Sequence, residues 1–212
     1  MKIGIIVDGD AESQALVNLI KNITIEGVQI IRPIYVDIQP KASADQIAKK
    51  AHERIPFLRA KDVDKIIVMI DREDTNECVP TLRASLEEAF GKLECSDVSV
   101  IIKDRKMENW LIADIEAIQS FPGRFQVTNA FANRIKPNKA DRIKDAEQLL
   151  NSIVVKKGPE YHKRRDALNI MAKQDAVRIS CNSRSFRRLL RLLSHPLYLE
   201  QSKRPHPDCK SA

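Results

Sequence analysis

The chain has 212 residues, of which 43% are hydrophobic and 31% are charged, so it can bury a core and is not a disordered polymer. No run reaches the roughly 18 apolar residues of a membrane span, and acids follow the first apolar run, Ile3–Val7, too soon for a signal peptide. The four cysteines are scattered without a CxxC pair, which argues against a zinc site or a disulfide framework. We therefore expect a cytoplasmic protein with reduced thiols.

The net charge of +7 is unevenly distributed. Residues 1–100 contain 13 Lys+Arg and 17 Asp+Glu, whereas residues 101–212 contain 23 Lys+Arg and 12 Asp+Glu. An acidic half joined to a basic half suggests a metal site beside a surface that binds polyanions. A solvated basic helical face accounts for the same charges.

Strand and helix patterns alternate through the first 121 residues. Short apolar runs predict buried strands at Ile3–Val7, Lys65–Ile70 and Val98–Ile102, and an edge or bulged strand interrupted by Pro33 at Val28–Val36. Helical patterns occupy Ala11–Thr24, Ser43–Ala60 with Ser43 as N-cap, Val79–Leu93, and Lys106–Ser120. Pro56 is expected to kink or end the second of these helices. This order predicts an α/β fold with a mainly parallel sheet and helices on both faces.

The remainder of the chain is predicted to be a helical C-terminal extension. Helical patterns cover Ala140–Val154, Tyr161–Lys173 and Ser183–Ser194, whereas the preceding segment contains Pro122, Gly123 and Pro137. The expected organisation is an α/β core at 1–121, a linker at 122–139, a basic helical region at 140–196 and a flexible tail at 197–212.

Acidic residues follow three of the predicted strands. Asp8 and Glu12 follow the first, Asp71 and Glu73 follow the Lys65–Ile70 strand, and Glu108 lies on the helix after the Val98–Ile102 strand. Ligands of open parallel sheets bind beyond the carboxyl ends of the strands, where gathered carboxylates are tolerable if a hard cation is bound. The pattern predicts a Mg²⁺ or Mn²⁺ site, with ordinary helix capping as the structural alternative.

Basic residues accompany these acids. Lys103, Arg105 and Lys106 are expected near the same edge of the sheet, where they would hold a scissile phosphate, with Lys103 as a catalytic candidate. A solvated helix start accounts for the same three residues equally well. The C-terminal helices carry further candidates for nucleic-acid binding, namely Lys163, Arg164, Arg184, Arg187, Arg188 and Arg191. The last four recur on one side of a helix, which suits phosphate-backbone binding and also docking on an acidic protein. Trp110 is expected in the core.

Three short motifs resemble those of the TOPRIM family. IIVDGDAES is similar to its first-strand motif of an acid and a glycine followed by a further acid, and IVMIDRED is similar to its Asp-x-Asp strand. MENWLIAD resembles a Glu-x-Trp-Leu-x-x-Asp segment of small TOPRIM-like prokaryotic proteins related to OLD-type nucleases. The resemblance covers roughly residues 1–120. It implies a TOPRIM-like fold, metal-dependent cleavage of nucleic acid, and a separately encoded ATPase partner in phage defence.

The resemblance also implies residue roles. Asp8 stands at the first acid, as a metal ligand or general acid/base, and Glu12 at the second acid of that motif. Asp71 and Glu73 stand at the two positions of Asp-x-Asp, with Asp74 as an adjacent candidate if the loop is shifted. Glu108 matches the acid before the tryptophan. Asp8, Asp71 and Glu108, with Lys103, are thus the catalytic candidates. Aspartate at position 8 and glutamate at position 73 depart from the family's glutamate and aspartate, and a methylene matters where octahedral geometry is needed.

The leading hypothesis is therefore a Mg²⁺- or Mn²⁺-dependent nuclease whose basic helices grip the nucleic acid. A catalytically silent TOPRIM-like module that docks on an ATPase or on nucleic acid is the first alternative, and the two altered acids favour it. A phosphoacceptor receiver domain is the second, but the basic extension and the Glu-x-Trp-Leu segment fit it poorly. A homo-oligomer is compatible with each reading.

Overall fold

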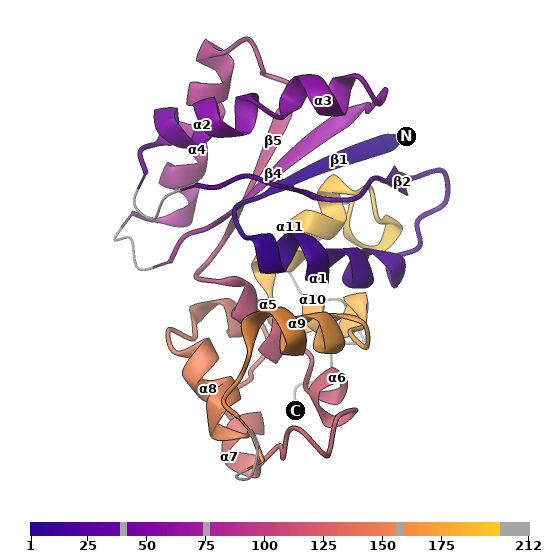
Figure 1. The fold of residues 1–212 in the computed structure, drawn as a ribbon, viewed down its shortest axis with the longest axis vertical. Coiled ribbons are helices and arrows are strands. Elements are labelled where there is room, and N and C mark those ends of the chain that lie inside the picture. Colours follow the sequence, from indigo (N-terminus) through magenta and orange to yellow (C-terminus); the bar gives the residue numbers. More distant parts are fainter. Residues whose placement is uncertain (39–41, 74–76, 156–158, 200–212) are drawn as a thin grey trace.

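The computed structural model describes residues 1–38, 42–73, 77–155 and 159–199. Its five strands are β1 Lys2–Val7, β2 Gln29–Ile30, β3 Ile34–Tyr35, β4 Lys65–Asp71 and β5 Val98–Lys103. All their pairings are parallel, in the order β2-β1-β4-β5 (Figure 1). On the same side of β1, β2 pairs with the beginning of this strand and β3 pairs with its end. The expected α/β fold with a mainly parallel sheet is confirmed.

The second predicted strand differs from the expectation. In place of one strand over Val28–Val36, the chain forms the two-residue strands β2 and β3, with Pro33 between them. Proline has no N–H to donate to a ladder, so it separates the two short pairings with β1.

The helices before residue 121 are α1 Asp10–Lys21, α2 Ala44–His52, α3 Ile55–Arg59, α4 Val79–Lys92, α5 Met107–Ile112 and α6 Ile115–Gln119. Two predicted helices are each divided. Pro56 lies in the first turn of α3, and Asp114 caps α6 by accepting a hydrogen bond from Ala117 N–H. The predicted N-cap at Ser43 is confirmed, with a full capping box to Gln46.

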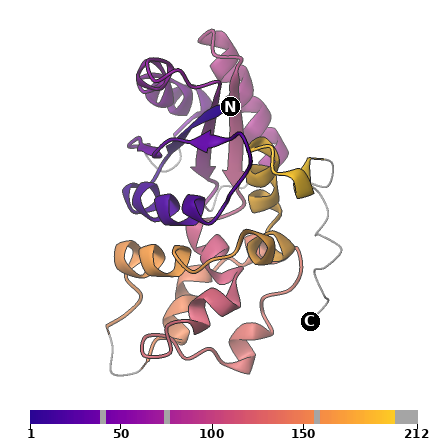
Figure 2. The same ribbon diagram turned by 90° about the vertical axis from the view of Figure 1, so that its right-hand side faces the viewer.

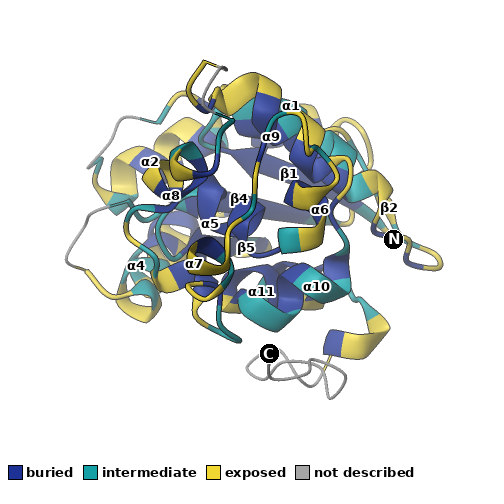
Figure 3. Cartoon of the chain, turned by 90° about the horizontal axis from the view of Figure 1, so that it is seen from below, coloured by how far each residue is buried: buried dark blue, intermediate teal, exposed yellow. Residues whose placement is uncertain are grey.

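Helices cover both faces of the sheet, because the strands are apolar on both sides. Ile6, Val68 and Val100 face the core formed with α2, α3 and α4. Val7 and Met69 face the opposite core, which also includes Trp110 and so confirms the expected burial of that residue. Seen from below, the buried strands β1 and β4 lie inside a shell of helices (Figure 3).

The C-terminal helices share this second core with the sheet. They are α7 Asn129–Ala132, α8 Ala146–Ser152, α9 Lys163–Met171, α10 Ala176–Asn182 and α11 Arg184–Leu192, with short 3₁₀ turns η1 Ala140–Arg142 and η2 Pro196–Tyr198. Of these, α7 lies within the predicted linker and α10 was not predicted. Helix α9 lies along α1 (Figure 2), and α11 lies along the edge strand β5, where Arg188 Nε donates to Val100 O at 3.1 Å. Residues 200–212, most of the predicted tail, lie outside the described residues.

Two further expectations concern cysteines and membranes. Cys78 is an exposed free thiol and Cys95 is a buried one. Cys209 lies outside the described residues, so the expectation that all four thiols are reduced stays a prediction. Within the described ranges, no helix is long and apolar enough to cross a membrane.

Candidate metal centre

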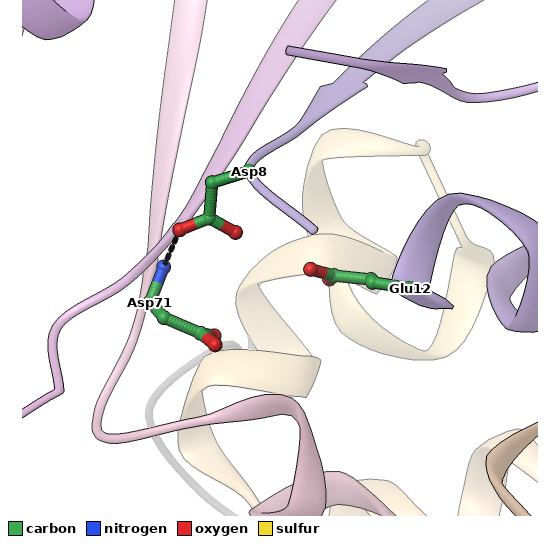
Figure 4. Close-up of side chains that lie close together, drawn as sticks. All are labelled: Asp8, Glu12 and Asp71. Atoms are coloured by element: carbon green, nitrogen blue, oxygen red, sulfur yellow. Dashed lines mark hydrogen bonds between the residues drawn. The ribbon is translucent and has the colours of Figure 1, made fainter. Parts of the chain in front are cut away.

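The carboxyl ends of β1 and β4 meet where the strand order reverses. From β1 the chain crosses to β2 on one side, and it later returns as β4 on the other side. Such a switch point is where open α/β sheets bind their ligands. Asp8 follows β1 directly, Asp71 ends β4, and Glu12 reaches the same place from the first turn of α1 (Figure 4).

Local sequence explains how Glu12 reaches the carboxylates of Asp8 and Asp71. Gly9 precedes α1, and a side chain there would put a Cβ 3.3 Å from the Cβ of Glu12, so the glycine leaves space for the inward-pointing glutamate. Glu12 lies in the first helical turn, where the helix dipole favours a negative charge. Its side chain is nevertheless buried, with the residue only 1% exposed.

The three carboxylates lie close enough to share one cation. One oxygen from each of Asp8, Glu12 and Asp71 lies within 4.8 Å of the others. Asp8 is held in place because its Oδ2 accepts a hydrogen bond from the backbone N–H of Asp71 at 2.7 Å (Figure 4). The expectation that these three residues converge at the sheet edge is confirmed.

Lys103 lies among the carboxylates. It ends β5 in register with Asp71 and is fully buried. Its Nζ lies 2.5 Å from Glu12 Oε2, 2.7 Å from Asp71 Oδ1 and 3.4 Å from Asp8 Oδ1. The predicted placement of Lys103 beside the acids is therefore confirmed.

One ammonium would not balance three ionised carboxylates, since two negative charges would remain. Burial raises the pKa of Glu12 to about 8, and the charges of Asp71 and Asp8 add to this while Lys103 opposes it. Burial likewise raises the pKa of Asp71 to about 6. For Lys103, burial disfavours the charge, but the three carboxylates outweigh it and raise the pKa well above its usual value. The site thus carries an uncompensated negative charge.

These residues fit a hard divalent cation. Oε1 of Glu12 is buried and has no hydrogen-bond partner among the described residues. Buried polar atoms of this kind are rare, because leaving one unpaired costs about 1–3 kcal/mol. A donor set made only of carboxylate oxygens suits Mg²⁺ or Mn²⁺, whose two charges would also cancel the excess.

The other two predicted ligands lie outside this group. Among the residues with described positions, the carboxylates whose oxygens come together include neither Glu73 nor Glu108. Glu73 has a positive φ of 52°, and its backbone N–H donates to Arg105 O at 2.9 Å. The expected five-residue ligand set is therefore reduced to three, because a left-handed turn follows β4. Asp74, the adjacent candidate, lies outside the described residues.

Glu108 contacts Tyr161 and Lys163. Its carboxylate is fully buried, with Oε1 accepting a hydrogen bond from Tyr161 Oη at 3.3 Å and lying 3.6 Å from Lys163 Nζ. Burial opposes the charge of Lys163, but the charges of Glu108 and then of Asp71 outweigh burial and raise the pKa of Lys163. The sequence did not single out Tyr161, because only the fold brings it to α5.

The remaining basic candidates do not form one face. Arg164 pairs with Asp10 of α1, and Lys106 is the N-cap residue of α5. Arg187 is fully buried and donates to Ser180 O and Asn138 Oδ1. The expectation that Arg187 faces nucleic acid is wrong, because the side of α11 that carries Arg187 packs on the core. Arg184 and Arg191 are exposed, and Arg188 is half-buried.

Comparison with known sequences gives one match. The model of a family described as a domain of unknown function, DUF4276, matches residues 7–194. This span runs from the last residue of β1 to the residues after α11, so it includes all three carboxylates and Lys103. No curated protein and no solved structure matches the chain.

Proposed function

The chain belongs to the DUF4276 family, and from the geometry of its acidic site we propose that it is a metal-dependent nuclease that hydrolyses phosphodiester bonds. One observation carries the proposal: Asp8, Glu12 and Asp71 bring carboxylate oxygens within 4.8 Å of one another, and a buried oxygen of Glu12 has no partner among the described residues. The motifs around these residues resemble TOPRIM motifs, and we extend the proposal to a TOPRIM-like core.

In this proposal each side chain has a separate task. Asp8, Glu12 and Asp71 hold Mg²⁺ or Mn²⁺, which when bound activates water and stabilises a leaving oxygen. Lys103 contacts the same carboxylates, so it is placed to hold the charge of a scissile phosphate. Lys163 Nζ lies 3.6 Å from Glu108 Oε1, and in this proposal it orients a second phosphate oxygen.

The proposed setting follows from the resemblance and the charge distribution. The exposed arginines of the basic half would contact the nucleic-acid backbone. A separately encoded ATPase would act as partner, in the cytoplasm and in phage defence. These expectations extend the site-based proposal. They are tested by adding the ATPase encoded next to this protein to the cleavage reactions of the matched variants.

Cleavage by matched variants tests the nuclease. Supercoiled plasmid, linear DNA and tRNA would be incubated with Mn²⁺ or with EDTA, using wild type, Asp71→Asn and Asp97→Asn. Asp97 pairs with Arg59 on the surface, so its variant removes the same charge away from the site. We expect Mn²⁺-dependent cleavage by wild type and Asp97→Asn, and none by Asp71→Asn. Equal activity in Asp71→Asn would contradict the proposed site.

A silent module is the second candidate, and the position of Lys103 favours it. The ammonium contacts all three carboxylates, as a built-in counter-ion would. In that case wild type binds no Mn²⁺ by calorimetry and cleaves nothing with any partner, but it still associates with an ATPase or with nucleic acid. Mn²⁺ binding by wild type that is lost in Asp71→Asn would eliminate this candidate.

A further inference from the structure

A charged cavity lies at the same end of the sheet as the acidic site, next to α4 and α11. Its volume is about 750 Å³, within the range of small-ligand pockets. Six arginines from four parts of the chain line it: Arg72, Arg83, Arg142, Arg184, Arg188 and Arg191. Only the last helix was expected to supply such residues, so the cavity is a product of the fold.

The acids nearby balance only part of this charge. Asp104 pairs with Arg72 at 2.5 Å, and Glu87 on α4 lies 3.5 Å from Arg188 and 3.7 Å from Arg83. Asp141 also lines the cavity, but it accepts hydrogen bonds from Ser183 and Ser185. Arg142 and Arg184 line the same cavity and pair with none of these carboxylates, which leaves an excess of positive charge.

Two details of the arginines show that the cavity is suited to an anion. Arg142 and Arg184 are exposed and form no ion pair with a described residue. Arg188 has a pKa lowered by burial and by the charges of Arg83 and Arg191, although Glu87 opposes this. The arginines therefore repel one another across the cavity, and a bound anion would relieve the repulsion.

The N-terminus of α4 adds to the same preference. Val79 and Pro80, in the first turn of this 14-residue helix, line the cavity, and the N-cap residue Cys78 makes no side-chain capping bond. The free N–H groups and the dipole of a helix N-terminus attract phosphate. The N-terminus of α4 therefore favours a negative charge in the same space that the arginines line.

We propose that this cavity binds the terminal phosphate of a nucleotide, either a free nucleoside polyphosphate or the phosphorylated end of a nucleic-acid strand. A phosphodiester carries one charge, whereas a terminal phosphate carries about 1.5–2 and a polyphosphate more, which suits the excess of arginines. A cavity of this volume also suits one nucleotide, not the side of a duplex. The proposal does not require a cation at Asp8, Glu12 and Asp71.

Binding in EDTA tests this cavity separately from the metal site. The probes are ATP, inorganic tripolyphosphate, and one short oligonucleotide with either a 5′-phosphate or a 5′-hydroxyl end. The variant Arg142→Ala/Arg184→Ala removes two exposed cavity arginines. Lys49→Ala/Arg54→Ala removes the same charge from exposed positions of the α2–α3 segment, and it serves as the control. Thermal unfolding would verify that both double variants fold like wild type.

We expect at least one terminal-phosphate probe to bind wild type and the control equally, and to bind the cavity variant about tenfold or more weakly. Binding of ATP and tripolyphosphate would identify a free nucleotide, and binding of only the phosphorylated oligonucleotide would identify a strand end. Asp71→Asn should keep this binding, so a failed metal site would not hide it. Equal affinity in the cavity variant, indifference to the 5′-phosphate without ATP binding, or no binding of any probe would overturn the proposal.

Discussion

Asp71 and Lys103 are direct neighbours across β4 and β5, and their charged groups meet at 2.7 Å in the centre of the acidic site. Because the two strands are parallel, both side chains reach the carboxyl edge of the sheet from the same face. This pairing fixes the position of one of the three carboxylates and of the Lys103 ammonium. Among the described residues, no other ammonium contacts these carboxylates. The following predictions test what that group does.

The stability of the metal-free protein should fall as pH rises from 6 to 8. The pKa of Glu12 is raised from 4.5 to about 8 by burial, so the folded state holds a proton that the unfolded state has released. The stabilisation from this proton is complete below the unfolded pKa and is lost as pH rises through the folded pKa. One proton corresponds to at most about 1.4 kcal/mol per pH unit.

Urea unfolding in EDTA at several pH values measures this slope. The difference between wild type and Glu12→Gln isolates Glu12, because groups such as His195 contribute equally to both. The variant should show a flatter dependence between pH 6 and 8. Parallel curves for the two proteins would mean that Glu12 is ionised in the folded state.

Mn²⁺ binding at pH 7 should release about one proton, because Glu12 must ionise to become a ligand. Calorimetry in two buffers of different ionisation enthalpy measures the number. Affinity should accordingly rise between pH 6 and 8. Wild-type binding heat that does not depend on the buffer would show that Glu12 takes no part.

Lys103→Met should destabilise the protein in EDTA by about 3–5 kcal/mol, since it leaves three carboxylates without their buried counter-ion. Mn²⁺ should restore part of this loss. The variant also separates the two functional candidates by thermal shift with metal. Stabilisation of wild type by Mn²⁺ supports the nuclease, whereas stabilisation of Lys103→Met alone supports the silent module.

Glu108→Gln should lower cleavage about 10–100-fold while nucleic-acid binding survives, because Glu108 acts next to the carboxylate group through Lys163. The amide keeps the size of the side chain and can still accept from Tyr161. Tyr161→Phe is the matched control, since it removes the hydrogen bond and keeps the carboxylate. Unchanged cleavage in Glu108→Gln would make this buried acid purely structural.

Substitutions of Arg187 and Arg184 should have opposite effects on stability and on nucleic-acid affinity, although the two residues lie one helical turn apart. Arg187→Met removes buried hydrogen bonds to Ser180 and Asn138, and should cost about 3 kcal/mol of stability. Arg184→Met removes an exposed charge, and should change stability by less than about 0.5 kcal/mol. Nucleic-acid affinity at low salt should fall only for Arg184→Met. A fall for a well-folded Arg187→Met would refute the placement of α11.

The sequence by itself determined the alternation of strands and helices, because each buried strand is a continuous apolar run and each long helix repeats its apolar residues. It also identified Asp8, Glu12 and Asp71, since acids at the ends of parallel strands must come to one edge. It also marked interruptions at Pro33 and Pro56, because proline has no N–H to donate. It did not indicate the break before α6, where Asp114 caps the helix.

Only the tertiary structure decided which charges lie together. A helical repeat says that Arg184, Arg187, Arg188 and Arg191 share a side, but not that β5 and the core cover part of that side. Likewise, nothing near Arg72 or Arg142 in the sequence indicates a common cavity, because 70 positions separate them and packing alone joins them. Tyr161 reaches Glu108, 53 positions away, for the same reason. Contacts between distant segments come from how whole faces pack, and local patterns carry no information about them.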